Sequence, residues 1–120
     1  SLGQRASALI IFILSMYETD LILIDQPEDD LDNQSIYNDV IKEICSLKNK
    51  TQFIFATHNP NIPVLGDSEQ VISCEYFDDK IKTNVSSIDD KLSQEEIINI
   101  MEGGEDAFKK RKEIYSIWKL

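Results

Sequence analysis

The side chains best suited to chemistry in this sequence follow two short apolar runs. The run Leu21–Asp25 leads into Gln26-Pro27-Glu28-Asp29-Asp30-Leu31-Asp32, so that five carboxylates lie within eight residues. The run Gln52–Thr57 leads into His58-Asn59-Pro60, which contains the only histidine of the chain. A carboxylate at the end of a buried strand is suited to bind Mg²⁺, and an imidazole is suited to donate a hydrogen bond to a phosphate oxygen.

A third candidate lies at the start, where Ser1-Leu2-Gly3-Gln4 precedes an apolar segment. A serine hydroxyl and backbone N–H groups at a helix N-terminus form an anion site, and Gly3 permits close approach. Each candidate has an ordinary structural alternative. Asp25 could cap the turn that follows it, His58 could be packed or hydrogen-bonded at a turn, and Ser1 could be a simple N-cap.

The hydrophobic pattern predicts the elements that must position these residues. A loop over 1–4 precedes a helix over 5–16, which is apolar nearly all round and therefore buried on several sides. Further along, we expect strands over 21–25 and 52–57 and an amphipathic helix over 34–47 between them. A hairpin should follow over 71–77 and 80–86. Next we expect a helix that is opened by a Ser93–Glu96 capping box and ended by Gly103-Gly104, and then a last helix over 105–118.

This order predicts an α/β fold with a partly parallel sheet flanked by helices, an added β-hairpin and C-terminal helices. In such sheets ligands bind at the carboxyl ends of the strands. The segments after residues 25 and 57 should therefore emerge at the same edge.

Composition narrows the function classes. The chain has 120 residues and a net charge of −10, which argues against nucleic-acid binding by this segment itself. Cys45 and Cys74 lie in no metal or redox pattern and are expected to be reduced core residues of a cytoplasmic protein. Residues 9–14 are too short a run to span a membrane. Because Ser1 is not an initiator Met, we expect the C-terminal part of a longer protein.

In this order and spacing the three motifs resemble the second half of an ABC-type ATPase head of the SMC, RecN and RecF-like kind. SLGQ resembles the signature motif, LILIDQP the Walker B strand, Asp30-Leu31-Asp32 the D-loop, and FATH the strand with the switch histidine. The runs 26–33 and 102–111 are closer still to the AAA-like ATPase regions of TrlF-type proteins, in which an ATPase is joined to a PHP-type phosphoesterase domain.

The resemblance implies roles for individual residues. Asp25 would hold Mg²⁺ and His58 would contact the γ-phosphate of ATP. Ser1, Gly3 and Gln4 would complete the ATP site of a second head, because such heads dimerise head to tail around ATP, and Asp32 would run across that interface. Residues 1–90 would carry these motifs, and residues 91–120 would add C-terminal helices to the same domain.

Two departures from the family pattern matter. The chain has no GxxxxGK[ST] sequence, so the P-loop lobe would have to lie upstream, and this segment alone should be inactive. Moreover, Gln26 occupies the position where a glutamate would serve as base, and an amide cannot accept a proton at neutral pH. Gln26 could only position water, as in small GTPases with turnover on the order of 10⁻⁴ s⁻¹. Alternatively Glu28 or Asp29 could supply a carboxylate, or the head could mainly hold ATP.

We therefore expect ATP binding and slow hydrolysis coupled to dimerisation, with Gln26, Glu28 and His58 as catalytic residues and ATP and Mg²⁺ as cofactors. The resemblance associates this with DNA repair or defence against foreign DNA, through nucleic-acid contacts made by other regions and without a membrane. An alternative is a non-hydrolysing, ATP-dependent dimerisation module that regulates an attached enzyme. A third is a receiver-like Mg²⁺ domain using Asp25, Asp29 and Asp30, which leaves SLGQ and His58 unexplained.

Overall fold

The computed structural model describes residues 2–16 and 20–119, which form two compact units, 1–67 and 68–120. The first unit contains α1 (Leu2–Leu14), β1 (Leu21–Asp25), η1 (Pro27–Asp29), α2 (Asn33–Ser35), η2 (Ile36–Ile41), α3 (Lys42–Leu47), β2 (Gln52–Ala56) and α4 (Asn61–Leu65). The second contains β3 (Val71–Phe77), β4 (Lys80–Ser86), α5 (Lys91–Met101) and α6 (Glu105–Ile117).

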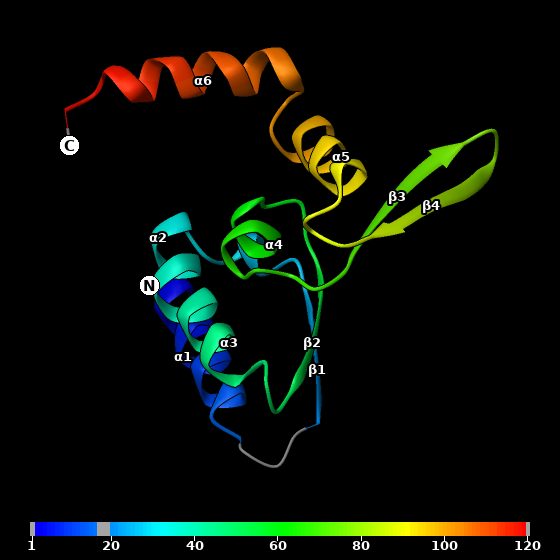
Figure 1. Cartoon of the computed structure of the whole chain (residues 1–120). Coiled ribbons are helices and arrows are strands. Elements are labelled where there is room, and N and C mark those ends of the chain that lie inside the picture. The colour runs from blue at the N-terminus through cyan, green and yellow to red at the C-terminus, as the bar shows by residue number, and fades with distance from the viewer. Residues whose placement is uncertain (1, 17–19, 120) are drawn as a thin grey trace. The chain divides into compact units, whose positions relative to one another are not determined.

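The first unit is a two-stranded parallel sheet with helices against it. β1 and β2 pair in register from Leu21 with Gln52 to Asp25 with Ala56. α1 and the helical segment 33–47 lie side by side along the strands (Figure 1). A parallel pair needs a crossover connection, and segment 33–47 supplies it. The α/β fold with a partly parallel sheet is therefore confirmed.

The core of this unit lies between the sheet and the helices. Its buried members are all aliphatic: Leu31, Ile36, Val40, Ile41, Ile44 and Ile62. Ile10 of α1 and the two phenylalanines of β2, Phe53 and Phe55, pack against them. Alternate residues of the strands point to the other face, where Leu21, Leu23 and Ile54 are exposed. This alternation is the two-residue period of a strand with one covered face.

Two details of the helices differ from the sequence expectations. Residues 2–4 are helical rather than a loop, and α1 ends at Leu14 because the Ser15 and Met16 N–H groups bond to carbonyls of its last turn. The expected helix over 34–47 is present, but its middle is a π-helix in which the Lys42 N–H donates to the Tyr37 carbonyl, five residues back. The wider turn brings Ile36, Val40 and Ile41 onto the buried side together.

The cysteines do not lie in a core, contrary to expectation. Both Cys45 and Cys74 are free and exposed. On α3 the buried position belongs to Ile44, which leaves the adjacent Cys45 on the outer side, where its Sγ lies 3.8 Å from the Leu65 carbonyl oxygen. On the hairpin, Cys74 pairs with Thr83.

The second unit is an antiparallel hairpin with α5 against it. β3 and β4 pair from Val71 with Ser86 to Phe77 with Lys80, with the bounds expected from sequence. The tip residues Asp78 and Asp79 both have positive φ, as a tight hairpin requires. α5 contacts both strands and buries Ser93 and Ile97.

The expected Ser93–Glu96 capping box is absent. The N-cap of α5 is Asp90, three residues before Ser93, and the helix begins at Lys91, so Ser93 lies inside the helix. Its hydroxyl bonds to Ser86, and the Glu96 carboxylate accepts from Asn84 at 3.1 Å. The two side chains that would have formed the capping box therefore bond to the hairpin instead.

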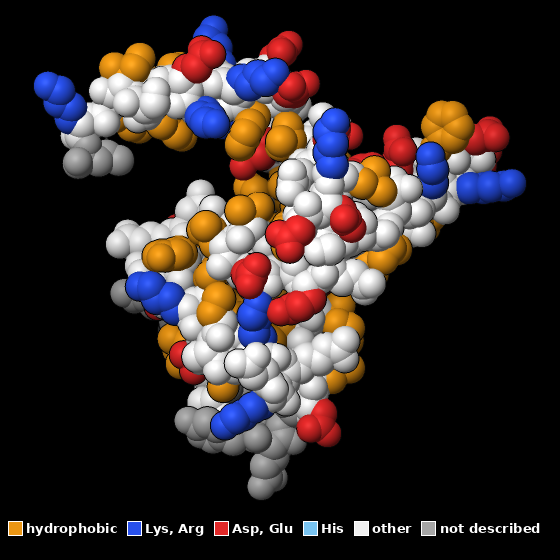
Figure 2. Space-filling view, in the orientation of Figure 1, with side chains coloured by type: hydrophobic (Ala, Val, Ile, Leu, Met, Phe, Trp, Pro, Cys, Tyr) orange, Lys and Arg blue, Asp and Glu red, His pale blue; other side chains and the backbone are white. Residues whose placement is uncertain are grey.

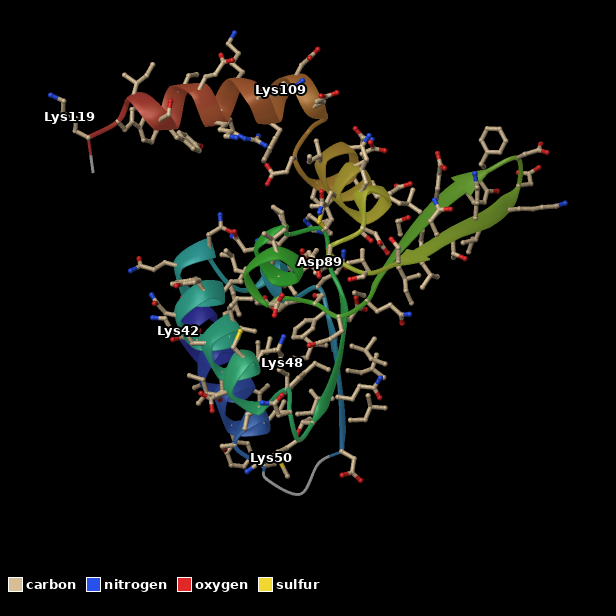
Figure 3. All side chains as sticks on the ribbon, in the orientation of Figure 1. Lys42, Lys48, Lys50, Asp89, Lys109 and Lys119 are labelled. Atoms are coloured by element: carbon tan, nitrogen blue, oxygen red, sulfur yellow. The ribbon has the colours of Figure 1, made fainter. Side chains whose placement is uncertain are left out.

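α6 is polar along most of its length. No residue of α6 is buried, and acidic residues precede and follow its four consecutive basic residues, 109–112. Side chains of both charges therefore lie along this helix (Figure 2). Lys109 pairs with Glu105, and Arg111 pairs with Glu102 (Figure 3 labels Lys109). The basic residues thus belong to a mixed, solvated face. None of the helices within the described ranges is long and apolar enough to cross a membrane.

Candidate functional site at the carboxyl edge of the parallel sheet

The segments that follow β1 and β2 and carry the candidate site residues emerge at the same edge of the sheet, as expected. Beyond the last strand pair, Asp25 with Ala56, the Gln26 N–H donates to the Ala56 carbonyl at 2.8 Å. One more backbone bond thus ties the segment after β1 to the end of β2. The chain then turns after both strands, and Glu28 of the first segment contacts Thr57 and His58 of the second.

Asp25 and Gln26 occupy a sharp turn. Gln26 has φ 45° and ψ 57°, a left-handed conformation that is uncommon for a residue with a side chain. Its carbonyl accepts from the Asp29 N–H at 3.1 Å, and Pro27 starts the short helix η1. The side chains of Asp25 and Gln26 are exposed. The Asp25 carboxylate makes no hydrogen bond or ion pair with the side chains that the structure describes, and its exposure leaves it open to a ligand.

A groove leads up to this turn. It has a volume of about 280 Å³ and is lined by apolar side chains of α1 and β1, with Asp25, Gln26 and Asp30 at its polar end. The described residues contain no group of three or more His, Cys, Asp or Glu side chains that could hold a metal ion. Asp25 is the candidate ligand for a cation at this edge, and Gln26 and Asp30 line the same groove.

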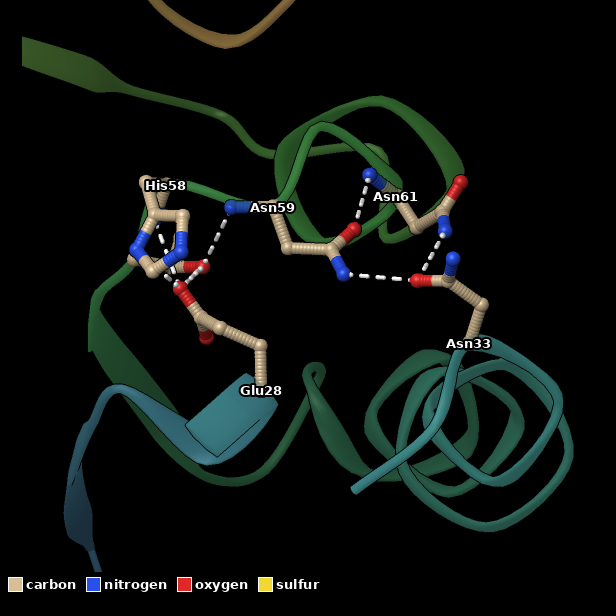
Figure 4. A network of polar contacts seen from close by, with 6 residues as sticks. Glu28, Asn33, His58, Asn59 and Asn61 are labelled. Atoms are coloured by element: carbon tan, nitrogen blue, oxygen red, sulfur yellow. Dashed lines mark hydrogen bonds and ion pairs between the residues drawn. The ribbon is translucent and has the colours of Figure 1, made fainter. Parts of the chain in front are cut away.

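Glu28 reaches from η1 across to the end of β2 (Figure 4). Its Oε1 accepts from the Thr57 hydroxyl at 2.8 Å and from the His58 backbone N–H at 2.7 Å. The same oxygen lies 3.0 Å from Nδ1 of the His58 ring. The glutamate side chain is 7% exposed, whereas the histidine ring is 63% exposed. One carboxylate oxygen therefore accepts two hydrogen bonds from the neighbouring loop and faces the His58 ring in an ion-pair contact.

The pKa of Glu28 is held below its ordinary value. Burial by itself raises the pKa, because it disfavours the charged form. The hydrogen bonds from the His58 backbone, the Glu28 backbone and Thr57, together with the charge of His58, outweigh that effect. Glu28 Oε2 is buried and has no hydrogen-bond partner within the described residues. The carboxylate is therefore ionised, with one oxygen fully used and the other unused.

A set of amides holds the two loops beside this contact (Figure 4). Asn33 Oδ1 accepts from Asn59 Nδ2 at 2.8 Å and from Asn61 Nδ2 at 3.3 Å. Asn59 in turn accepts from the Asn61 backbone N–H and donates its own N–H to the Thr57 hydroxyl. These contacts join the start of α2 to the start of α4, a short helix that the hydrophobic pattern did not predict.

The other residues predicted for the site have simpler surroundings. Asp32 is the N-cap of α2, where its Oδ1 accepts from the Ser35 N–H at 2.8 Å. Gly3 and Gln4 lie in the first turn of α1, and Ser1 lies outside the described residues. Sequence reasoning missed Thr57 and Asn33 as parts of the site. Hydroxyl and amide side chains directly after a strand, as in Thr57-His58-Asn59, were the available signal.

Residues 1–64, more than half of the chain, match the model of a protein family described as "AAA domain, putative AbiEii toxin, Type IV TA system". The fold and this match define an ATPase-type domain. The chain belongs to this AAA-domain family. No curated protein matches the chain.

Proposed function

We propose that this chain carries the signature, Walker B, D-loop and switch-histidine segments of an ABC-type head. The head would be SMC/RecF-like and nearest to the ATPase regions of TrlF-type proteins. It would bind ATP with Mg²⁺, dimerise head to tail and hydrolyse ATP slowly. The observation that carries this proposal is the meeting of Glu28 with His58, at 3.0 Å, beside an open Asp25 at the end of β1. Membership in the AAA-domain family supports the binding of a nucleotide.

The residues present fit a phosphate-bound Mg²⁺. Mg²⁺ usually takes one or two carboxylates and completes its shell with water and substrate phosphates, rather than using a cage of protein ligands. Asp25 offers one exposed carboxylate at a rigid strand end, and no cluster of further ligands surrounds it within the described chain. Asp25 would therefore hold the ion, which when bound would neutralise charge on the phosphate oxygens.

The side chains around Asp25 divide the remaining work. The Gln26 amide can donate to and accept from a water, and so orient it, without taking its proton. The unused Glu28 Oε2 can accept from such a water, while Oε1 holds the next loop. The outward nitrogen of His58 can donate to a phosphate oxygen when the ring is protonated. Ser1, Gly3, Gln4 and Asp32 would meet the second head, and a P-loop lobe would supply the phosphate cradle.

A second function is favoured by the state of Glu28. Its lowered pKa makes it a weaker base, and Gln26 cannot be one. A head with these two residues is suited to hold ATP and to signal by dimerisation to an attached enzyme. A role in DNA repair or in defence against foreign DNA is proposed on the resemblance alone.

Turnover by the intact protein separates the two functions. We expect slow phosphate release that falls by about 100-fold or more in Asp25→Asn, because metal-assisted charge stabilisation is worth several kcal/mol. It should rise in Gln26→Glu, which restores a base. Asp106→Asn makes the same chemical change on α6, which carries none of the proposed site residues, and should leave turnover unaltered. ATP-induced dimers without phosphate release would favour the regulatory module, whereas neither binding nor turnover would contradict both.

A further inference from the structure

Glu28 and His58 form a contact between two segments that are 30 residues apart in the chain. Two hydrogen bonds reach Oε1, from the Thr57 hydroxyl and the His58 backbone N–H, and the His58 ring nitrogen Nδ1 faces the same oxygen at 3.0 Å. Because the Glu28 side chain is 93% buried, with 7% exposed, its charge is not dispersed by water. The contact therefore fixes both the backbone and the ring of the residue at the end of the loop.

The contact also determines which ring nitrogen of His58 is available. A nitrogen that faces a carboxylate oxygen at 3.0 Å carries hydrogen, so Nδ1 is a donor in either charge state of the ring. In the neutral ring Nε2 then has a lone pair, and in the protonated ring it is a second donor. The ring is mostly exposed, so Nε2 is open to a ligand.

We propose that Glu28 is a positioning residue for His58, which uses Oε1 to hold the ring through Nδ1 and to leave Nε2 directed at a phosphate oxygen. This inference deepens the proposed function. Of its parts, only the contact of Nε2 with a phosphate oxygen rests on that function. The orientation and the tautomer follow from the contact of Glu28 Oε1 with Nδ1 of the ring. The partner of one ring nitrogen determines which of the two nitrogens carries the hydrogen in the neutral ring.

The chemistry of the three donors explains why this residue is a glutamate. A carboxylate can accept through either oxygen without any donor atom that could clash with the three N–H and O–H groups. Hydrogen bonds to a charged acceptor are also about twice as strong as neutral ones. Glutamine offers a single oxygen and no charge, so Glu28→Gln should preserve the arrangement but weaken it. Alanine should release the ring.

Nitrogen NMR of the imidazole tests the orientation without ATP, and the chain has one histidine, so one signal pair reports it. At a pH where the ring is neutral, the wild-type chain should show hydrogen on Nδ1. Glu28→Ala should shift the population towards hydrogen on Nε2, while Thr57→Val and the matched exposed change Glu113→Gln should not. A wild-type ring with hydrogen on Nε2 would overturn the proposal, even if Glu28→Ala failed to fold.

A double-mutant cycle in the intact protein tests the consequence for ATP. Glu28→Gln should lower kcat about ten-fold, the equivalent of one charge-assisted hydrogen bond, with a change in KM for ATP below about two-fold. In a His58→Ala background the same change should cost little more, because the residue to be positioned is gone. Losses that multiply would show that Glu28 acts independently of His58 and would overturn the proposal. If the intact protein lacks turnover, the hydrolytic function fails and the NMR result decides this inference by itself.

Discussion

At the scale of single residues, the main electrostatic feature of the site is the charged, nearly enclosed carboxylate of Glu28. The carboxylate is nearly enclosed, yet its pKa is lowered because the donors from Thr57 and His58 outweigh burial. A lowered pKa means that the folded chain binds a proton at Glu28 less readily than the unfolded chain does. The contact therefore stabilises the fold fully only above the ordinary glutamate pKa of 4.5.

This sign predicts how stability depends on pH. The contribution of Glu28 is lost as the pH falls from the ordinary value through the lowered folded pKa, so the free energy of unfolding should decline in that window. Glu28→Gln removes the titrating group, and its decline should be shallower. Urea unfolding at a series of pH values from about 7 to 3 measures both curves, with Glu113→Gln as the control that should follow wild type. Parallel curves for wild type and Glu28→Gln would contradict the pKa direction.

Residue positions could be predicted from sequence where the main chain decides them, and not where side chains choose partners. Asp25 follows four apolar residues, so its place at a strand end followed from the pattern. The partner of Glu28 lies 30 residues away, and nothing in a local pattern encodes that distance. The same limit applies to Ser93, whose local context favours a cap but whose hydroxyl bonds to Ser86 on the hairpin.

At the scale of elements, the helical segment between the strands bears most of the core. Its π-helical middle contributes Ile36 and Val40, the two largest side chains that are fully enclosed, and Ile41 is nearly so. The apolar spacing predicted a helix, because 36, 40 and 44 recur every four residues. The same spacing could not predict the π-helical turn. A turn that is wider by one residue is compatible with the same apolar positions in the sequence.

Truncation of this segment should be costly. Ile36→Ala should lower the free energy of unfolding by about 2–5 kcal/mol, because it removes buried methyl groups and leaves a cavity in a packed site. Ile81→Ala makes the same change at a hairpin position that is 74% exposed, and should cost less than about 0.5 kcal/mol. Urea midpoints with unchanged slopes measure both effects. A small effect at Ile36 would mean that the π segment repacks around the loss.

At the scale of the whole molecule, the two units differ in how much they bury. The first unit encloses six aliphatic side chains in one cluster, whereas in the second the enclosed residues within the described chain are Ser93 and Ile97. α6 buries none, and its last residue Ile117 and the adjoining Trp118 are 77% and 57% exposed. Composition could not predict this inequality, because apolar residues are plentiful in both units.

Hydrogen exchange should reveal this inequality directly. Amides in segments with few buried contacts open with low free energies, while those in a packed core exchange only through larger unfolding events. We expect the slowest exchange in β2 and residues 36–44, and much faster exchange throughout α6, in dilute protein at neutral pH. Samples at several concentrations provide the control, because self-association through exposed apolar side chains would protect α6 in a concentration-dependent way. Protection of α6 equal to that of α3 at every concentration would mean that burial does not govern local stability in this chain.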